Sequence, residues 1–190
     1  MKKVNSNLDA LIPIMEEKNK IRKTADCRNP NYVGAAAEFN WLPGYIVKLD
    51  AEQRVKGGQY LKKCITDNNL DLIIIPDQYL YIIPESYHPY TELTELSIGK
   101  KIEGIQGKDQ TINVHQTKQF IKLIIETGIA DLKWRNLVHC EDGKIALIDT
   151  ESFWGSYYGL HSLLDNIRDK EIRFLVENEI NQLWNKTNRP

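Results

Sequence analysis

Four residues in the segment 131–151 have side chains that could carry chemistry: Asp131, Asn136, Asp149 and Glu151. Carboxylates can accept protons, and carboxylate and amide oxygens are the ligands that Mg²⁺ prefers. The turn residues at 141–143 (Glu-Asp-Gly) lie between two apolar segments, which predicts a short β-hairpin. A hairpin brings its two ends together, so we expect Asn136 and Asp149 to lie close to each other.

This arrangement resembles the catalytic segment of the protein-kinase superfamily, in which a loop of the form H-R-D-x-x-x-x-N precedes a hairpin that ends in Asp-Phe-Gly. The resemblance implies that Asp131 accepts the proton of a hydroxyl nucleophile. It implies that Lys133, two positions later, neutralises the transferred phosphoryl group. Asn136 and Asp149 would bind Mg²⁺ or Mn²⁺, with Glu151 as an additional ligand. The implied cofactor is ATP with one of these metals.

The resemblance extends toward the N-terminus and covers about residues 32–153. The strand-like segment 45–48 (Tyr-Ile-Val-Lys) is similar to the V-A-I-K motif, whose lysine contacts the α- and β-phosphates. Small residues at 34–37 stand where the family has its glycine-rich loop, and residues 82–85 stand where it has the hinge that binds adenine. The implied nucleotide-binding residues are Lys48, Gly34, Ala35, Ile83 and Glu85.

Several family features are absent from this sequence. Ile129 and Ala130 replace the His-Arg pair, so activation through a phosphorylated loop is not expected. Thr150 and Glu151 replace Phe-Gly, no G-x-G-x-x-G is present, and the helix after Lys48 offers no clear glutamate partner. Little sequence remains after Glu151, as in minimal bacterial effector-type kinases.

Hydrophobic periodicity predicts the elements that position these residues. Helices are expected at 7–25, 52–67 and 113–127, with one or two more after residue 160. Strands are expected at 45–49, 70–75 and 78–83 and in the hairpin, and the segment 87–110 is expected to be an irregular connection. The adjacent glycines at 57–58 indicate that another segment packs closely against the second helix.

The third helix has the clearest boundaries. Asn113 and Gln116 match a capping box, the segment 114–125 carries an apolar face, and Gly128 ends the helix. Its expected buried positions are Val114, Thr117, Ile121, Ile124 and Ile125. The whole order predicts an α+β fold: a single bilobal, protein-kinase-like domain (1–190). It would have a small antiparallel-sheet N-lobe (about 1–85, with an N-terminal helix) and a reduced helical C-lobe (about 86–190).

Composition excludes some functions. Lys plus Arg total 25 and Asp plus Glu total 26, so the net charge of −1 offers no general basis for binding nucleic acid. No apolar run approaches the roughly 20 residues that span a bilayer, so a membrane protein is not expected. The three cysteines at 27, 64 and 140 form neither a disulfide framework nor a metal motif, and His139 with Cys140 is interpreted as an ordinary strand pair. A cytoplasmic location follows, and delivery into a host cell would fit an effector.

Our first functional hypothesis is an ATP- and Mg²⁺-dependent kinase that phosphorylates a protein hydroxyl. A short C-lobe leaves little material for a small-molecule pocket, whereas a protein substrate brings its own surface. The alternatives are a pseudokinase that only binds a partner, and nucleotidyl transfer on the same fold. The oligomeric state stays open.

Overall fold

The computed structural model describes residues 36–37, 44–48, 51–82, 95–107 and 110–187. The expected helix at 7–25 and the predicted site residues Gly34, Ala35, Ile83 and Glu85 lie outside these ranges. The described residues form two compact units. The first contains the residues up to Lys56 together with Asp77–Lys101, and the second contains Gly57–Pro76 and the residues from Ile102 onward.

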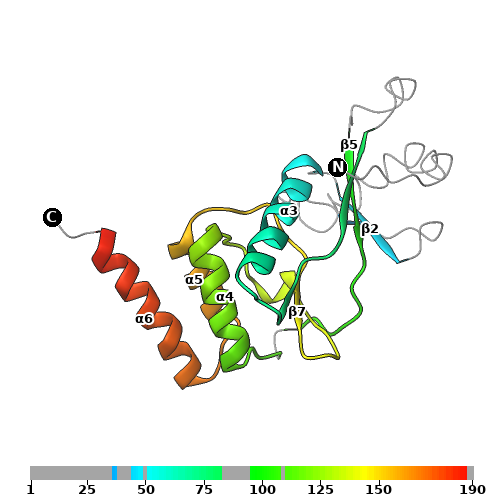
Figure 1. Ribbon diagram of the computed structural model, residues 1–190. Coiled ribbons are helices and arrows are strands. Elements are labelled where there is room, and N and C mark those ends of the chain that lie inside the picture. Colours follow the sequence, from blue (N-terminus) through cyan, green and yellow to red (C-terminus); the bar gives the residue numbers. More distant parts are fainter. Residues whose placement is uncertain (1–35, 38–43, 49–50, 83–94, 108–109, 188–190) are drawn as a thin grey trace, which may run out of the picture. The chain divides into compact units, whose positions relative to one another are not determined.

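The first unit contains an antiparallel sheet with the strand order β1-β2-β5-β4 (Figure 1). The strands are β1 (Ala36–Ala37), β2 (Tyr45–Lys48), β4 (Gln78–Ile82) and β5 (Glu95–Lys100). In the register, Val47 of β2 and Tyr79 of β4 both pair with Ile98 of β5. Val47 and Ile98 are buried, and in β5 the three consecutive residues Leu96, Ser97 and Ile98 are all buried, as expected for a strand in the interior of the sheet.

Strand β5 falls in the segment that was expected to be an irregular connection, so that expectation was wrong. Its apolar signal is only the short Leu96-Ser97-Ile98, too brief for a local pattern. The strand lies between β2 and β4, and pairing on both sides stabilises it. Ile82 pairs with Glu95, so β4 and β5 belong to one sheet, and the chain leaves the first unit after Lys101.

The second unit contains a smaller sheet and most of the helices. Its strands are β3 (Ile73–Ile74), β6 (Leu137–His139) and β7 (Ile145–Leu147), in the order β3-β7-β6. β6 and β7 pair antiparallel with Leu137 opposite Leu147, which confirms the predicted hairpin. β3 pairs with β7 in parallel. Helix α3 (Ala51–Asp67) starts in the first unit and belongs to the second from Gly57 onward.

Helix α4 (Val114–Thr127) has the predicted capping box. The Asn113 side chain accepts a hydrogen bond from the Gln116 N–H (3.0 Å), and the Gln116 side chain accepts one from the Asn113 N–H (2.9 Å). Gly128 ends the helix in a left-handed conformation, with φ at 72°. The amide of Gln116 also donates to the Gly143 carbonyl (2.7 Å), so the same cap fixes the hairpin turn.

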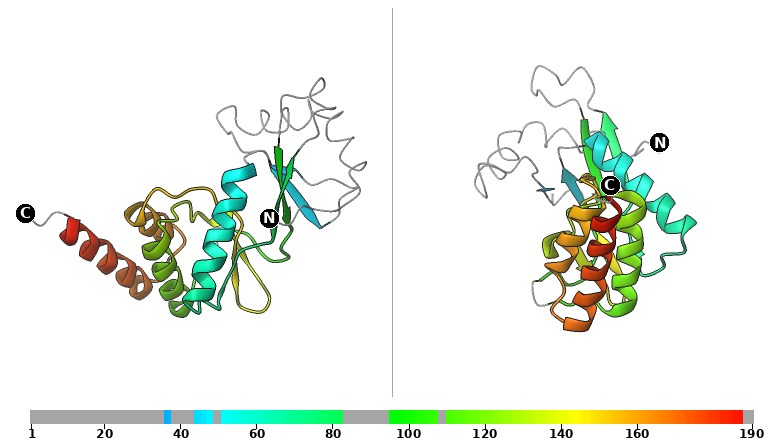
Figure 2. Two further views of the ribbon diagram at one scale, coloured as in Figure 1. Left: turned by 45° about the horizontal axis from the view of Figure 1, so that its top comes forward. Right: turned by 90° about the vertical axis from the view of Figure 1, so that its left-hand side faces the viewer.

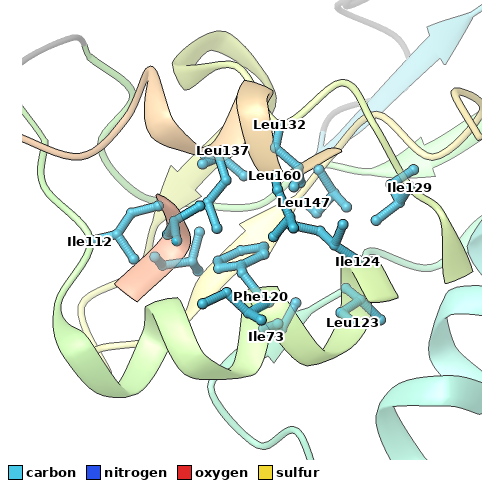
Figure 3. Close-up of a cluster of buried hydrophobic side chains, with 14 of the residues drawn as sticks. Ile73, Ile112, Phe120, Leu123, Ile124, Ile129, Leu132, Leu137, Leu147 and Leu160 are labelled. Atoms are coloured by element: carbon cyan, nitrogen blue, oxygen red, sulfur yellow. The ribbon is translucent and has the colours of Figure 1, made fainter. Parts of the chain in front are cut away.

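The core of the second unit surrounds α4 (Figure 3). Phe120, Leu123 and Ile124 of this helix are fully buried among residues of the hairpin and of α5 (Ser156–Leu164). The predicted face was partly misplaced: Val114 and Ile125 are exposed, because the stripe that packs inward is centred on Phe120.

Helix α6 (Lys170–Thr187) lies beside α4 and α5 in both views (Figures 1 and 2). This confirms the expected C-terminal helices, although α5 begins before residue 160. Ile172, Val176 and Ile180 bury the inner face of α6, while Phe174 and Trp184 are exposed. None of the helices that the structure describes is long and apolar enough to cross a bilayer.

Candidate catalytic and metal-binding loops

The segment 129–136, called here the catalytic loop, connects α4 to the hairpin. Its last residues form a short 3₁₀ turn, Trp134–Asn136, closed by a hydrogen bond from the Asn136 N–H to the Lys133 carbonyl (2.7 Å). The Asn136 side-chain amide donates to the backbone carbonyl of Asp131 (2.9 Å). Both residues are buried. The predicted spacing of Asp131 and Asn136 therefore corresponds to a closed loop in which one residue fixes the backbone of the other.

Two cationic side chains flank the carboxylate of Asp131. The ammonium of Lys133 lies 3.8 Å from Oδ1, and the guanidinium of Arg135 lies 3.5 Å from Oδ2. Among the described residues, the buried Oδ1 accepts no hydrogen bond. The arrangement gives a carboxylate held between two positive charges that are themselves partly exposed. Arg135 was not singled out from the sequence, although its position four residues after Asp131 is a signal that could have identified it.

Helix α5 holds the catalytic loop from the other side. The Ser162 hydroxyl accepts a hydrogen bond from the Leu132 N–H (2.9 Å), and the Asn166 side-chain amide donates to the Leu132 carbonyl. Gly159 lets the helix approach closely, because a Cβ atom at this position would lie 2.2 Å from the Ile129 carbonyl oxygen. No local sequence pattern marks Gly159, Ser162 or Asn166.

The segment 149–155, called here the metal loop, follows the hairpin and contains Asp149 and Glu151. The Ile148 N–H donates to the Asn136 carbonyl (3.0 Å), so the chain returns to Asn136 immediately before Asp149. The hairpin thus joins the two loops at their ends, as its pattern predicted. The loops are also linked by a hydrogen bond from the Ala130 N–H to the Ser152 carbonyl (2.8 Å).

Helix α3 packs against the metal loop through Gly57. A Cβ atom at Gly57 would lie 1.8 Å from the Thr150 carbonyl oxygen and 2.9 Å from the Phe153 ring. The ring of Phe153 lies 5.9 Å from that of Tyr60, one helical turn along α3. This confirms, for Gly57, that the glycine pair marks a close approach of another segment. The segment is the backbone between Asp149 and Glu151.

The predicted metal ligands are an amide, Asn136, and two carboxylates, Asp149 and Glu151. Hard oxygen donors of this kind suit Mg²⁺ or Mn²⁺. Over the described ranges no three His, Cys, Asp or Glu side chains gather in one place that could hold a metal ion. The metal and its position stay predictions.

The remaining predicted nucleotide-binding residue in the described ranges is Lys48, at the end of β2. Its backbone carbonyl accepts a hydrogen bond from the Ser97 hydroxyl (3.3 Å), which ties β2 to β5. Glu52, in the first turn of α3, forms an exposed ion pair with Lys56 (2.6 Å). The N-terminus of α3 is tied to the sheet, because the Glu52 N–H donates to the Glu95 carboxylate (3.1 Å).

A cavity of about 670 Å³ lies at the far end of the hairpin, where Ile74, Gly104, His139 and Cys140 form part of its wall. Burial lowers the pKa of His139 below 6.5 and raises the pKa of the Cys140 thiol above 9.0. The Cys140 thiol is thus kept protonated and lacks the properties of an activated nucleophile. None of the predicted site residues that the structure describes lines this cavity.

Comparison with known proteins gives no family. No protein-family model matches the chain. No curated protein matches it either.

Proposed function

We propose that this chain is an ATP- and Mg²⁺-dependent phosphotransferase with a protein-kinase-like centre, and that its acceptor is a protein hydroxyl. The observation that carries the proposal is the hydrogen bond from the Asn136 amide to the Asp131 backbone, in a loop whose hairpin returns to Asn136 just before Asp149. A proton acceptor and two oxygen donors for a metal then belong to one small, hydrogen-bonded assembly. Isolated solvated carboxylates would not need such a frame.

In the proposed reaction a hydroxyl oxygen attacks the γ-phosphorus of ATP, the bond from phosphorus to the ADP oxygen breaks, and the hydroxyl proton passes to the carboxylate of Asp131. Lys133 and Arg135 supply positive charge beside that carboxylate, where the transferred phosphoryl group carries negative charge. Asn136, Asp149 and Glu151 would hold the metal, which supplies charge neutralisation at the phosphates. Lys48 keeps its sequence-based role as a phosphate ligand.

We infer a protein acceptor because the two described helices after the metal loop, α5 and α6, have their inner faces committed to the core. Cys64 and Cys140 are free thiols, which fits a reducing, cytoplasmic compartment, including that of a host cell if the chain is delivered as an effector.

Thermal unfolding with ATP, with and without Mg²⁺, tests the nucleotide site. A ligand that binds only the folded chain stabilises it by RT ln(1 + [L]/Kd), so millimolar ATP with Mg²⁺ should raise the Tm of the wild type and of Asp131→Ala. Asp149→Ala should lose the Mg²⁺-dependent part. Asp142→Ala is the matched control, because Asp142 is an exposed carboxylate at the hairpin turn that pairs with Lys144 (3.1 Å).

Transfer is tested with γ-labelled ATP and candidate protein acceptors, followed by intact-mass measurement of the product. A gain of one phosphoryl group that Asp131→Asn abolishes supports the proposal. A gain of a nucleotide monophosphate would identify nucleotidyl transfer instead. Absence of any Mg²⁺-dependent shift in the wild type at millimolar ATP would overturn the proposed function and leave the pseudokinase as the better hypothesis.

A further inference from the structure

We propose that Ser162 and Asn166 are positioning residues for Asp131, acting through the backbone of Leu132. The inference rests on the proposed function, because it assigns these two side chains to the same reaction. Ser162 lies on α5, and Asn166 follows two residues after the end of that helix. Nothing in the sequence pattern marks either residue, and both contact the loop position that directly follows the predicted proton acceptor.

The peptide group between Asp131 and Leu132 is held on both edges. Its carbonyl accepts the Asn136 amide (2.9 Å), and its N–H donates to the Ser162 hydroxyl (2.9 Å). That N–H also lies 3.0 Å from the Ala130 carbonyl. A peptide plane fixed at both edges restrains ψ of Asp131 and φ of Leu132. The bond to Ser162 therefore restrains the backbone from which the Asp131 side chain projects, and this is the basis of the proposed positioning role.

Asn166 fixes the next carbonyl along the chain. Its Nδ2 donates to the Leu132 carbonyl and to the Ser162 carbonyl (3.2 Å). These two acceptors determine how the amide is oriented, since the opposite orientation would place its oxygen against two carbonyl oxygens. The Leu132 side chain is fully buried in the core. Leu132 is thus held at its N–H, its carbonyl and its side chain.

The Asn166 amide acts in this contact as a donor. Asn166 is buried, and its Nδ2 donates to the Leu132 and Ser162 carbonyls. An apolar side chain of the same shape would leave the Leu132 carbonyl without this donor. The feature of Asn166 that the inference requires is therefore its N–H donor to Leu132.

Amide hydrogen exchange and kinetics on the full chain test the proposal together. The reaction probe is hydrolysis of ATP with Mg²⁺, in which water replaces the unidentified acceptor. Ser162→Ala should raise exchange in the segment 130–136 and lower kcat by about 10-fold or more, since small misplacement of a reacting group costs up to about 10²-fold. The KM for ATP should change by less than about 3-fold, because the nucleotide's own ligands are intact. Ser162→Thr keeps the hydroxyl and should restore both.

Asn166→Asp supplies a signature that simple destabilisation would not give. A carboxylate cannot donate to the Leu132 carbonyl, whereas a protonated carboxyl group can, and burial favours that protonated form. The ratio of variant to wild-type kcat should therefore rise as the pH is lowered from 8 toward 6. Asn166→Leu has no donor at any pH and should show no such rise.

Two matched controls separate position from chemistry. Ser156→Ala removes a hydroxyl from the same helix, where it donates to the Ile124 carbonyl (3.1 Å). Asn68→Asp makes the same amide-to-acid change at the end of α3, where the amide donates to the Cys64 carbonyl (3.0 Å). Neither should alter exchange in 130–136 or produce the pH-dependent ratio.

The outcomes are distinguishable. Unchanged exchange in 130–136 for Ser162→Ala overturns the inference whatever the activity is. Raised exchange with wild-type kcat in an active protein overturns the positioning role. A wild type with neither hydrolysis nor a Mg²⁺-dependent ATP shift overturns the proposed function itself, and with it the catalytic part of this inference. Raised exchange, reduced kcat and recovery in Ser162→Thr support it.

Discussion

The catalytic loop and the metal loop each pack against a glycine in a helix, but the other contacts that accompany this packing differ. The catalytic loop rests on Gly159 of α5, and side chains of the α5 segment also bind its backbone. The metal loop packs against Gly57 of α3, where the Thr150 carbonyl occupies the space that a Cβ atom would take. At Gly159 close packing is combined with hydrogen bonds from Ser162 and Asn166, and at Gly57 the Thr150 backbone packs directly against the helix.

This difference has a mechanistic meaning under the proposed function. A proton acceptor must keep one direction toward its substrate, which hydrogen bonds can enforce because they are directional. A metal ligand mainly requires that its loop stay at a given distance from the partner ligands, which close packing can enforce. The two loops pack against the same hydrophobic core, so the comparison can be tested by changing that core first and then each glycine contact separately.

Phe120→Ala should have the largest effect on stability, because it removes a large side chain from the core that both loops share. Phe120 is fully buried in the cluster that also contains Leu132 of the catalytic loop and Leu147 beside the metal loop (Figure 3). Loss of a buried phenylalanine costs about 3–5 kcal/mol. Urea denaturation should show this loss. Ile125→Ala, an exposed position on the same helix, should cost less than about 1 kcal/mol. Equal losses for the two variants would contradict the assigned core face of α4.

Gly57→Ala should have the next largest effect and should act on the metal loop. The new Cβ would meet the Thr150 carbonyl oxygen at 1.8 Å, and a backbone atom cannot move aside as a flexible side chain can. Overpacking costs about 1–3 kcal/mol or more, which outweighs the roughly 1 kcal/mol that alanine gains in a helix. We expect lower stability and a weaker Mg²⁺-dependent ATP shift.

The control for Gly57→Ala is Gly99→Ala in β5, where a Cβ would make only ordinary contact with the Gln78 side chain at 3.8 Å. Stability should then stay close to wild type. If Gly57→Ala were as stable as wild type and kept its full ATP shift, the close seat of the metal loop on α3 would be wrong.

Local patterns predicted the parts of this comparison that depend on residues near each other in the sequence. The spacing of Asp131 and Asn136, the hairpin, the capping box and the end of α4 at Gly128 are all short-range features, and the structure contains them. The glycines at 57–58 signalled a close approach, although the sequence could not name Thr150 as the partner. The kinase-like resemblance and its functional residues remain predictions.

Long-range contacts account for what the sequence did not predict. Strand β5 exists because β2 and β4 pair with it on both sides, and these strands come from distant segments. Ser162 and Asn166 contact a residue 30 and 34 positions earlier, so no local window contains both partners. Phe174 and Trp184 are apolar but exposed, because the inward stripe of α6 is set by its packing and not by composition.

Gly159→Ala should have a smaller effect than Gly57→Ala and should act on the catalytic loop. The new Cβ would lie 2.2 Å from the Ile129 carbonyl oxygen and 2.7 Å from the Ile124 side chain, which can partly move aside. A shift of α5 would also lengthen the bond from Leu132 to Ser162. A double-mutant cycle measures this dependence by urea denaturation.

In that cycle, Gly159→Ala and Ser162→Ala should couple by about 0.5 kcal/mol or more, since both act on one contact surface. Gly57→Ala and Ser162→Ala act on different loops and should add to within about 0.5 kcal/mol. If the second pair couples as strongly as the first, the contacts at Gly57 and Gly159 are energetically coupled, and the two loops cannot be treated as separate.

The pH dependence at His139 should be the smallest effect, and it tests the hairpin that joins the two loops. Burial lowers the pKa of His139 from 6.5, although Glu103, Glu141 and Asp142 line the same cavity and would favour the charged ring. As the pH falls, His139 therefore takes up a proton more readily in the unfolded chain than in the folded chain. The associated stability is fully present above pH 6.5 and is lost as the pH falls through that value toward the lower pKa of the folded state.

Urea denaturation between pH 7.5 and 5 should show that the free energy of unfolding of the wild type declines as the pH falls. This decline should be smaller in His139→Gln. His115→Gln, at an exposed position on α4, should decline like the wild type. If the decline in His139→Gln is the same as in the wild type, the group whose protonation lowers the stability lies elsewhere. Protonation in the hairpin would then not affect the stability of the fold, and a pH dependence of kcat would be sought in the catalytic loop.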